Sequence, residues 1–358
     1  MVFYRVWIPV GRGRSNLFME EWFPDGSVQR QRTFCYTGNT MEDVNGYIQM
    51  IDFSAYSLGT TDIDEAAVQA LSENLMHSFT TSGFAYLKNT GITDEQVTSV
   101  FDVADKFYDL PVDVKQKYRR NETDFHERHG WVCMEGENLG KLNGLQRPPD
   151  LKELFNIKPP LSGGDSWPSE VPEFEETCMD FFNQAHDLAK RVLELIARGL
   201  GTEAADFLDM FKFIGKGRNS SHLRSIRYPP VPETVKENQV RCGEHTDFGC
   251  ITLLFQDNAG LEVAKGDGEF VAAPPITDTV VINIADTLQR WSADKLVSTK
   301  HRVMLPYTPE TRGTTRRCVT FFTHPDFDAV MKCLDGSDKY PPVRAEDYVA
   351  SRLRKMYL

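Results

Sequence analysis

The chain has 358 residues, of which 41% are hydrophobic, and a formal net charge of −12. This length allows a large buried core, either in one β-barrel-type unit or in roughly two domains. The acidic charge argues against nucleic acid and against an anionic membrane surface as partners, although an acidic protein can still contain a locally basic pocket.

The cysteines and the N-terminus indicate a reducing compartment. The seven cysteines are scattered, odd in number and contain no Cys-x-x-Cys pair, so no disulfide framework is expected. No segment approaches the roughly 18 apolar residues of a membrane-spanning helix, and no basic segment precedes a long apolar run at the N-terminus. We therefore expect a cytoplasmic protein without a membrane partner, and we expect it to be a monomer.

The first half of the chain mixes helical and strand patterns. Residues 1–46 show few periodic signals and are interpreted as an N-terminal extension with a hairpin at most. Residues 47–215 form a mixed region that is expected to pack on a barrel. Its predicted elements are strands at 49–53 and 83–87, a helix at 61–79 with a capping box of Asp62 and Glu65, a helix that begins at Thr93 with Gln96 and ends before Pro111, and a long amphipathic helix at 172–200.

The second half, residues 216–358, is dominated by short strand-like runs. They are expected at 223–228, 251–255, 261–263, 280–284 and 318–322, with a turn at Gly266-Asp267-Gly268 and a helix at the C-terminus. Helices first and many short strands later predict an α+β fold in which an antiparallel barrel or jelly roll is backed by helices.

Two motifs in this half indicate a metal site. They are His245-Thr246-Asp247 and, 56 residues after the first histidine, His301. Residues i and i+2 of a strand point to the same face, so His245 and Asp247 can hold one ion together. Two imidazoles and a carboxylate form the facial triad of non-haem iron(II), which leaves coordination positions open. Manganese and zinc also fit these donors, although structural zinc sites favour cysteine-rich sets.

The other six histidines are expected to have ordinary roles. A lone His-x-Asp triplet is a weak motif and arises often by chance. The remaining histidines lie on predicted helices, strands or loops and are interpreted as packing, surface or structural residues: His77, His126, His129, His186, His222 and His324.

The surroundings of the triad raise its significance. The segment 241–257 resembles the iron-binding segment of the 2-oxoglutarate- and iron(II)-dependent dioxygenases, in the branch that includes isopenicillin N synthase, 1-aminocyclopropane-1-carboxylate oxidase and the plant flavonoid oxygenases. The resemblance runs from about residue 47 to the C-terminus and includes the segments 83–92, 107–118, 150–157, 260–263, 281–291 and 298–303. Ala285 stands where the family usually has glycine, and Thr90 replaces a common histidine.

The resemblance implies a distorted double-stranded β-helix, or jelly roll, with flanking helices. It implies that Fe(II) is held by His245, Asp247 and His301, with no further residue acting as a general base. Dioxygen and 2-oxoglutarate would be the cosubstrates, and succinate and carbon dioxide would be released. The reaction would be hydroxylation, desaturation or oxidative ring closure at an unactivated C–H bond of a small molecule, in specialised metabolism.

The family binds the far carboxylate of 2-oxoglutarate with an Arg-x-Ser pair and a tyrosine. The register places Arg316, Cys318 and Tyr228 at these positions. A thiol is a weaker hydrogen-bond donor than a hydroxyl. Cys318 therefore leaves two interpretations open: 2-oxoglutarate bound without the usual hydroxyl, or an oxidase of the same fold that does not use 2-oxoglutarate. A catalytically silent binding or sensing protein is a third alternative, which the intact triad argues against.

The substrate pocket is the least constrained part of the prediction. Its candidate residues are Arg128, Trp131, Phe155 and Phe322, for each of which a structural role is at least as plausible. Arg224 could be a cation of the pocket, but a surface arginine at the end of a strand is the plainer expectation. These residue types suit a small polar or carboxylate-bearing substrate.

Overall fold

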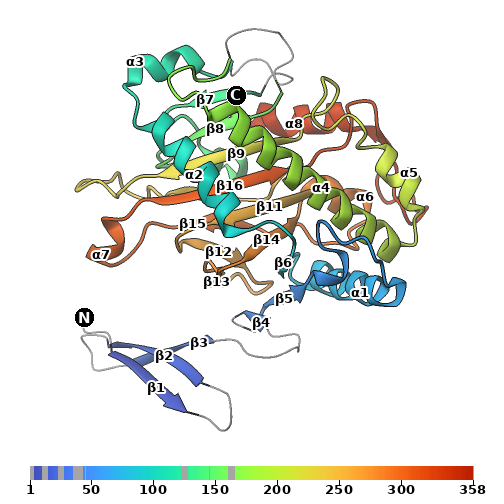
Figure 1. The fold of residues 1–358 in the computed structure, drawn as a ribbon, viewed down its shortest axis with the longest axis horizontal. Coiled ribbons are helices and arrows are strands. Elements are labelled where there is room, and N and C mark those ends of the chain that lie inside the picture. The colour runs from blue at the N-terminus through green and yellow to red at the C-terminus, as the bar shows by residue number, and fades with distance from the viewer. Residues whose placement is uncertain are drawn as a thin grey trace.

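The computed structural model describes residues 4–9, 15–22, 28–34, 43–44, 46–121, 128–144, 146–159 and 166–357. Within these residues the chain forms three layers: helices, a large sheet and a small sheet (Figure 1). This arrangement confirms the predicted α+β fold with a jelly-roll core. In the described part of the chain, no helix is long and apolar enough to cross a membrane.

The large sheet has nine strands. All neighbours pair antiparallel except β5 and β6, which are parallel. The strand order is β4 (Asp43–Val44), β5 (Ile48–Asp52), β6 (Phe84–Lys88), β14 (Thr279–Ile284), β11 (Ile251–Gln256), β16 (Arg316–Phe322), β9 (His222–Tyr228), β8 (Glu153–Ile157) and β7 (Gly130–Val132).

The small sheet has four antiparallel strands and faces the large one. Its order is β10 (Cys242–His245), β15 (His301–Val303), β12 (Leu261–Ala264) and β13 (Phe270–Ala272). Residues 265–268 form the predicted turn between β12 and β13, closed by a hydrogen bond from the Gly268 N–H to the Lys265 carbonyl at 3.0 Å.

Three long helices cover the other face of the large sheet and its β5–β6 end. They are α1 (Glu65–Thr81), α2 (Asp94–Tyr108) and α4 (Phe174–Leu200), and Figure 1 shows α2 and α4 crossing over the central strands. The shorter helices are α3 (Val112–Lys115), α5 (Ala204–Asp209), α6 (Asp286–Trp291), α7 (Pro309–Arg312) and α8 (Ala345–Tyr357).

The helix ends follow local chemistry. Thr93 and Gln96 form the predicted capping box of α2, and Gly201 ends α4 with φ of +71°, a conformation that suits glycine. The predicted capping box of α1 is wrong. The helix begins at Glu65, and Asp64 rather than Asp62 accepts hydrogen bonds from Ala66 and Ala67 N–H, because a cap must lie directly before the first helical residue.

The N-terminal extension contains more strand than the sequence suggested. In place of a single hairpin, β1 (Tyr4–Pro9), β2 (Ser15–Trp22) and β3 (Val28–Phe34) form an antiparallel sheet of three strands. Another short pair, β17 (Val330–Met331) and β18 (Val343–Arg344), precedes α8.

The alternation of side chains separates two cores. On β16, Val319 and Phe321 pack toward the helices, whereas Cys318 belongs to a second apolar cluster between the two sheets. The same alternation places Ile226 and Tyr228 of β9 between the sheets. We call the side of the large sheet that faces the small sheet its inner face. This face carries the candidate active site.

Candidate active site

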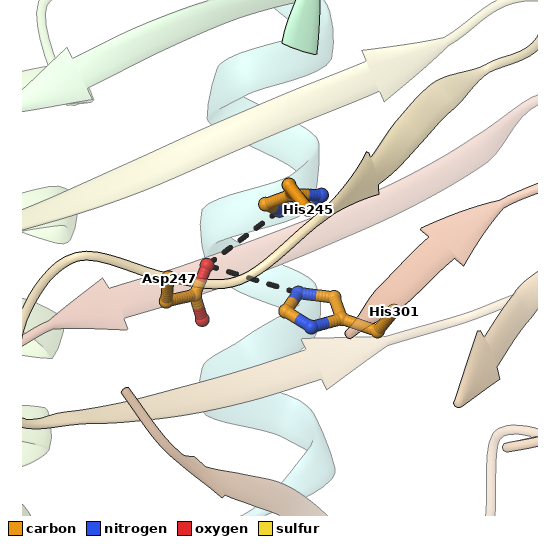
Figure 2. A group of neighbouring side chains, drawn as sticks. All are labelled: His245, Asp247 and His301. Atoms are coloured by element: carbon orange, nitrogen blue, oxygen red, sulfur yellow. Dashed lines mark ion pairs between the residues drawn. The ribbon is translucent and has the colours of Figure 1, made fainter. Parts of the chain in front are cut away.

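The small sheet brings the three predicted metal ligands together. β10 and β15 pair with His245 directly opposite His301, and Asp247 follows β10 by two residues. The Nε2 atoms of His245 and His301 lie 3.6 Å and 3.7 Å from Oδ1 of Asp247 (Figure 2). One potential ligand atom from each residue lies within 4.8 Å of the others. One cation can therefore contact all three side chains.

Hydrogen bonds orient all three side chains toward this point. The Nδ1 atoms of His245 and His301 lie 2.7 Å and 3.2 Å from the carbonyl oxygens of Gly243 and Thr299. A carbonyl only accepts, so each Nδ1 carries the ring proton, and each Nε2 presents its lone pair to the site.

The carboxylate of Asp247 is held from behind. Its Oδ2 accepts hydrogen bonds from the Thr252 hydroxyl at 2.7 Å and from the Asn283 amide at 2.9 Å. Oδ1 is thereby left to face the two imidazoles. Partners of this kind fix the orientation of a metal ligand and contribute to metal affinity.

The protonation states also suit a metal ion. Burial and, to a smaller extent, the nearby His245 together lower the pKa of His301 to about 4. Burial alone would raise the pKa of Asp247, but His301, His245 and the Asn283 amide outweigh it and keep the pKa below its usual range. At neutral pH the site offers a neutral imidazole and a carboxylate, which are the forms that bind metal.

The predicted cosubstrate residues lie on the inner face, on neighbouring strands. Arg316 of β16 pairs directly with Tyr228 of β9, and its Cζ lies 5.0 Å from the centre of the tyrosine ring. The Arg316 guanidinium is buried. It donates from Nε to the Asn258 carbonyl at 3.0 Å and from Nη2 to Gln256 Oε1 at 2.6 Å.

One polar atom here has no partner among the described residues. Nη1 of Arg316 is buried without an acceptor, beside the buried side chain of Tyr228. A buried cation with an unpaired donor is costly unless a ligand supplies the acceptor. An arginine donor beside a tyrosyl hydroxyl fits a carboxylate.

Cys318 shares this face as a neutral thiol. Burial raises its pKa, and the Arg316 guanidinium opposes but does not cancel that effect. It therefore offers only a weak S–H donor at the position where the resemblance implies a serine.

A hollow opens beside the metal ligands, with about 460 Å³ of space free of protein atoms, part of it open to solvent. It is lined by Arg128, Leu139, His222, Arg224, His245, Thr246, Asp247, Phe248, Phe322 and His324. Two of the four predicted substrate residues, Arg128 and Phe322, are among them. Arg224, expected on the surface, is 8% exposed and also lines the hollow.

The other two predicted substrate residues do not line this hollow. Trp131 and Phe155 pair directly between β7 and β8 and belong to the apolar core under the helices. Phe155 contacts Phe107 with ring centres 5.0 Å apart, and the Trp131 indole donates to Glu153 at 3.1 Å. These strand positions do not favour direct contact with a substrate. The predicted substrate role of the two residues stays a prediction.

Four site residues were missed at the level of sequence. His222 and His324 line the hollow, and Thr252 and Asn283 hold Asp247. Strand parity gives a signal for His222, since it lies an even number of residues from Tyr228 and therefore on the same face of β9. No comparable signal identifies Asn283, because its role depends on the pairing of β14 with β11.

The chain matches two family models. Residues 219–325 match the 2OG-Fe(II) oxygenase superfamily, and residues 48–175 match the N-terminal region described for a non-haem dioxygenase in morphine synthesis. The first match contains the metal ligands and Arg316. The second covers most of the region before the long helix α4.

Fungal relatives match along most of the chain. The 2-oxoglutarate-Fe(II) type oxidoreductase hxnY of Emericella nidulans is 30% identical over 332 residues, which are 86% of this chain and 90% of the relative. The proline hydroxylase buaE of Petromyces alliaceus is 30% identical over 336 residues, 87% of this chain and 99% of the relative.

A solved structure is similar over the same range. A full-length Neurospora crassa protein crystallised with alpha-KG, which is 2-oxoglutarate, superposes with a TM-score of 0.74 at 32% identity and covers 86% of this chain and 95% of its own. The same protein was also crystallised with alpha-KG and thymine; that structure has a TM-score of 0.74 at 30% identity, with 86% and 97% of the two chains covered.

Proposed function

Because the chain belongs to the 2OG-Fe(II) oxygenase superfamily, we propose that His245, Asp247 and His301 hold its Fe(II) and that Arg316, Tyr228 and Cys318 bind its 2-oxoglutarate. The observation that carries the assignment is that the Nε2 atoms of His245 and His301, each with a free lone pair, both lie close to Oδ1 of Asp247. The unpaired Nη1 of the buried Arg316 supports the cosubstrate part.

The reaction is the oxidation of a C–H bond in a small molecule. When bound, iron(II) with 2-oxoglutarate and dioxygen supplies an oxidant strong enough for an unactivated C–H bond, and succinate and carbon dioxide are released. The chain contributes position. His245 and His301 present lone pairs, Thr252 and Asn283 keep Asp247 in place, and Arg316 anchors the far carboxylate at the other end of the same sheet face.

The proposed 2-oxoglutarate and substrate sites lie at opposite ends of the inner face of β16. Along the inner face of β16 the residues run from Arg316 through Cys318 and Thr320 to Phe322. Thr252, the partner of Asp247, lies opposite Phe322. The anchor for 2-oxoglutarate is thus at one end of this strand, and the hollow begins at the other. We assign the hollow to substrate, with Arg128 and Phe322 in contact with it.

The substrate is proposed to be small and polar. Arg128 and Arg224 make the hollow locally basic in a chain of net charge −12. This supports a substrate with hydrogen-bond acceptors, including one that bears a carboxylate. We also propose a role in specialised metabolism. We further propose that the enzyme is a cytoplasmic monomer, which size-exclusion chromatography with light scattering and imaging of a tagged chain would test.

The first experiment is the anaerobic addition of Fe(II) and 2-oxoglutarate to the purified protein. The expected result is a weak visible charge-transfer band, which His301→Ala removes. Arg316→Met should weaken 2-oxoglutarate binding, whereas the surface variant Arg344→Met serves as a matched control. If the native protein gives no band and never releases succinate, the assignment of the cosubstrate is wrong.

The second experiment identifies the substrate class. Succinate release is measured across a panel of amino acids, terpenoids, phenolics, alkaloids and nucleobases, with proline and thymine included because the names of two relatives mention them. A true substrate increases succinate release above the uncoupled background and yields an oxidised product in equal amount.

A further inference from the structure

The part of the hollow farthest from Arg316 contains two buried histidines that the proposed reaction does not use. His222 and His324 are 2% and 3% exposed, and their rings are nearly parallel with centres 6.3 Å apart. Phe322 stacks on His222 at 5.1 Å. The walls of this end are therefore flat groups.

His222 lines the hollow and carries an unpaired acceptor. Its Nδ1 lies 3.0 Å from the Ser220 carbonyl oxygen, so Nδ1 carries the proton of the neutral ring. Burial lowers the pKa of His222 well below its usual range, and Arg128 and Arg224 add to this effect, which keeps the ring neutral. Nε2 therefore carries a lone pair, and it is buried without a partner among the described residues. A ligand group that satisfies it must be a donor.

Arg224 presents a donor two residues further along the same face of β9. Its Nε donates to Asn156 at 2.8 Å and its Nη1 to Glu137 at 3.3 Å. Nη2 is the remaining nitrogen of this guanidinium and, like the other two, can only donate. His222 and Arg224 are about 7 Å apart along the strand, a span within reach of one ring and two hydrogen bonds.

His324 adds a second unsatisfied nitrogen. Its Nδ1 is buried without a partner in the described part of the chain, while its backbone is fixed by hydrogen bonds to Ser221 and Asn219. Because either tautomer is available to a neutral ring, this nitrogen can match a donor or an acceptor of the ligand.

We propose that the substrate is a flat cyclic amide or imide, with its ring N–H donated to Nε2 of His222 and its carbonyl oxygen accepting from Nη2 of Arg224. This inference rests on the proposed function and narrows its substrate. A carboxylate is the weaker candidate at this end, since its oxygens would face the lone pair of His222. The flat walls formed by Phe322 and the two imidazoles also favour a planar ring.

The test uses the full-length protein with Fe(II) and 2-oxoglutarate under anaerobic conditions. Three probes are titrated: uracil, 1,3-dimethyluracil, which keeps the ring but has no N–H, and benzoate, a flat carboxylate. Binding is followed by the change in the charge-transfer band and by calorimetry. Uracil is expected to bind at least about 10-fold more tightly than the other two probes, because only uracil has an N–H for Nε2 of His222. With the other two probes this buried acceptor stays unpaired.

Variants then locate the contact. His222→Phe keeps a stacked ring without the acceptor and should remove the preference for uracil over dimethyluracil, while the 2-oxoglutarate affinity stays unchanged. His222→Gln, which keeps an acceptor, should restore part of the preference. His77→Phe, at an exposed position of α1, should change nothing.

The two hypotheses fail in different ways. Absence of the charge-transfer band with 2-oxoglutarate alone contradicts the proposed function. A normal band together with no uracil binding, equal binding of dimethyluracil, tighter binding of benzoate, or a preference that survives His222→Phe overturns the cyclic amide and leaves the oxygenase assignment intact.

Discussion

At the scale of single residues, Cys318 separates the two interpretations that the sequence left open. The proposed carboxylate anchor contains the buried guanidinium of Arg316 with its unpaired Nη1, and Tyr228 lies beside it. The comparisons place the chain among 2-oxoglutarate-dependent enzymes. We therefore interpret the thiol as a weak element of the proposed 2-oxoglutarate site rather than as evidence for a different electron source.

Cys318→Ser should tighten 2-oxoglutarate binding. A serine hydroxyl is a better donor than a buried neutral thiol, and one added hydrogen bond contributes roughly 0.5–1.5 kcal/mol, which corresponds to about a 2- to 10-fold lower Kd. Calorimetric titration of 2-oxoglutarate into the iron-loaded protein measures the change. Cys333→Ser, at a cysteine outside the site, is the control. An unchanged or weaker affinity would show that the thiol does not face the cosubstrate.

Thr252→Val should lower iron affinity without unfolding the protein. The substitution keeps the shape of the side chain and removes the 2.7 Å hydrogen bond to Oδ2 of Asp247. Loss of such a partner typically weakens metal binding about 10- to 100-fold. Competition with a coloured chelator measures the affinity, and Thr80→Val on the exposed face of α1 is the matched control.

At the scale of elements, the turn after the His-x-Asp motif depends on close backbone approach. A Cβ atom at Gly249 would lie 2.2 Å from the Thr323 carbonyl oxygen, which accepts a hydrogen bond from the Cys250 N–H. This contact joins the start of β11 to the end of β16. Through it, the residues that follow Asp247 are fixed to the strand that ends at Phe322.

Gly249→Ala should therefore lower the free energy of unfolding by about 1–3 kcal/mol, as forced overpacking does, and should also weaken iron binding. Gly266→Ala is the control, since a Cβ atom there meets nothing within 4 Å. Urea unfolding of the two variants measures the difference. If both behave alike, the close contact with Thr323 is not required.

At the scale of the whole molecule, a buried network of charges joins segments that are distant in sequence. Glu137 accepts from Arg224 of β9 at 3.3 Å and pairs with Lys152 at 3.3 Å, and Lys152 also lies 3.2 Å from Asp150. Burial would raise the pKa of Glu137, but Arg224, Lys152 and Arg120 outweigh it and hold the pKa below its usual range. The network supports Arg224 at the edge of the hollow.

Glu137→Gln should destabilise the protein by about 3–5 kcal/mol at neutral pH, because the cations would remain buried without their partner. The pKa of Glu137 is lower in the folded state than the unfolded value of about 4.3, so its contribution is present above that pH and is lost as the pH falls. The difference between native and variant should thus shrink below about pH 4. Urea unfolding across pH measures it, and the surface variant Glu346→Gln should show about 1 kcal/mol or less at every pH.

Sequence predicted the long elements and the metal ligands for physical reasons. The apolar stripe of α4 and the capping box of α2 are local patterns, and they were found where expected. The triad needed only strand parity and a recognisable motif. The roles of Asn283, His222 and His324 depend on which strands are neighbours, and that information lies in long-range pairing rather than in any local pattern. For Trp131 and Phe155, too, it is the pairing of β7 with β8 that determines their place in the core under the helices.

The run from Arg316 to Phe322 on one face of β16 has a practical consequence for inhibitors. A dicarboxylate that mimics 2-oxoglutarate would be displaced by raising the cosubstrate concentration. The same holds for such mimics in related enzymes, so a mimic of this kind would not be selective. A compound confined to the His222 end would not be displaced in this way. Its selectivity would come from side chains outside the proposed iron and 2-oxoglutarate sites, and a linker that passes Thr320 would join the two kinds of ligand into one molecule.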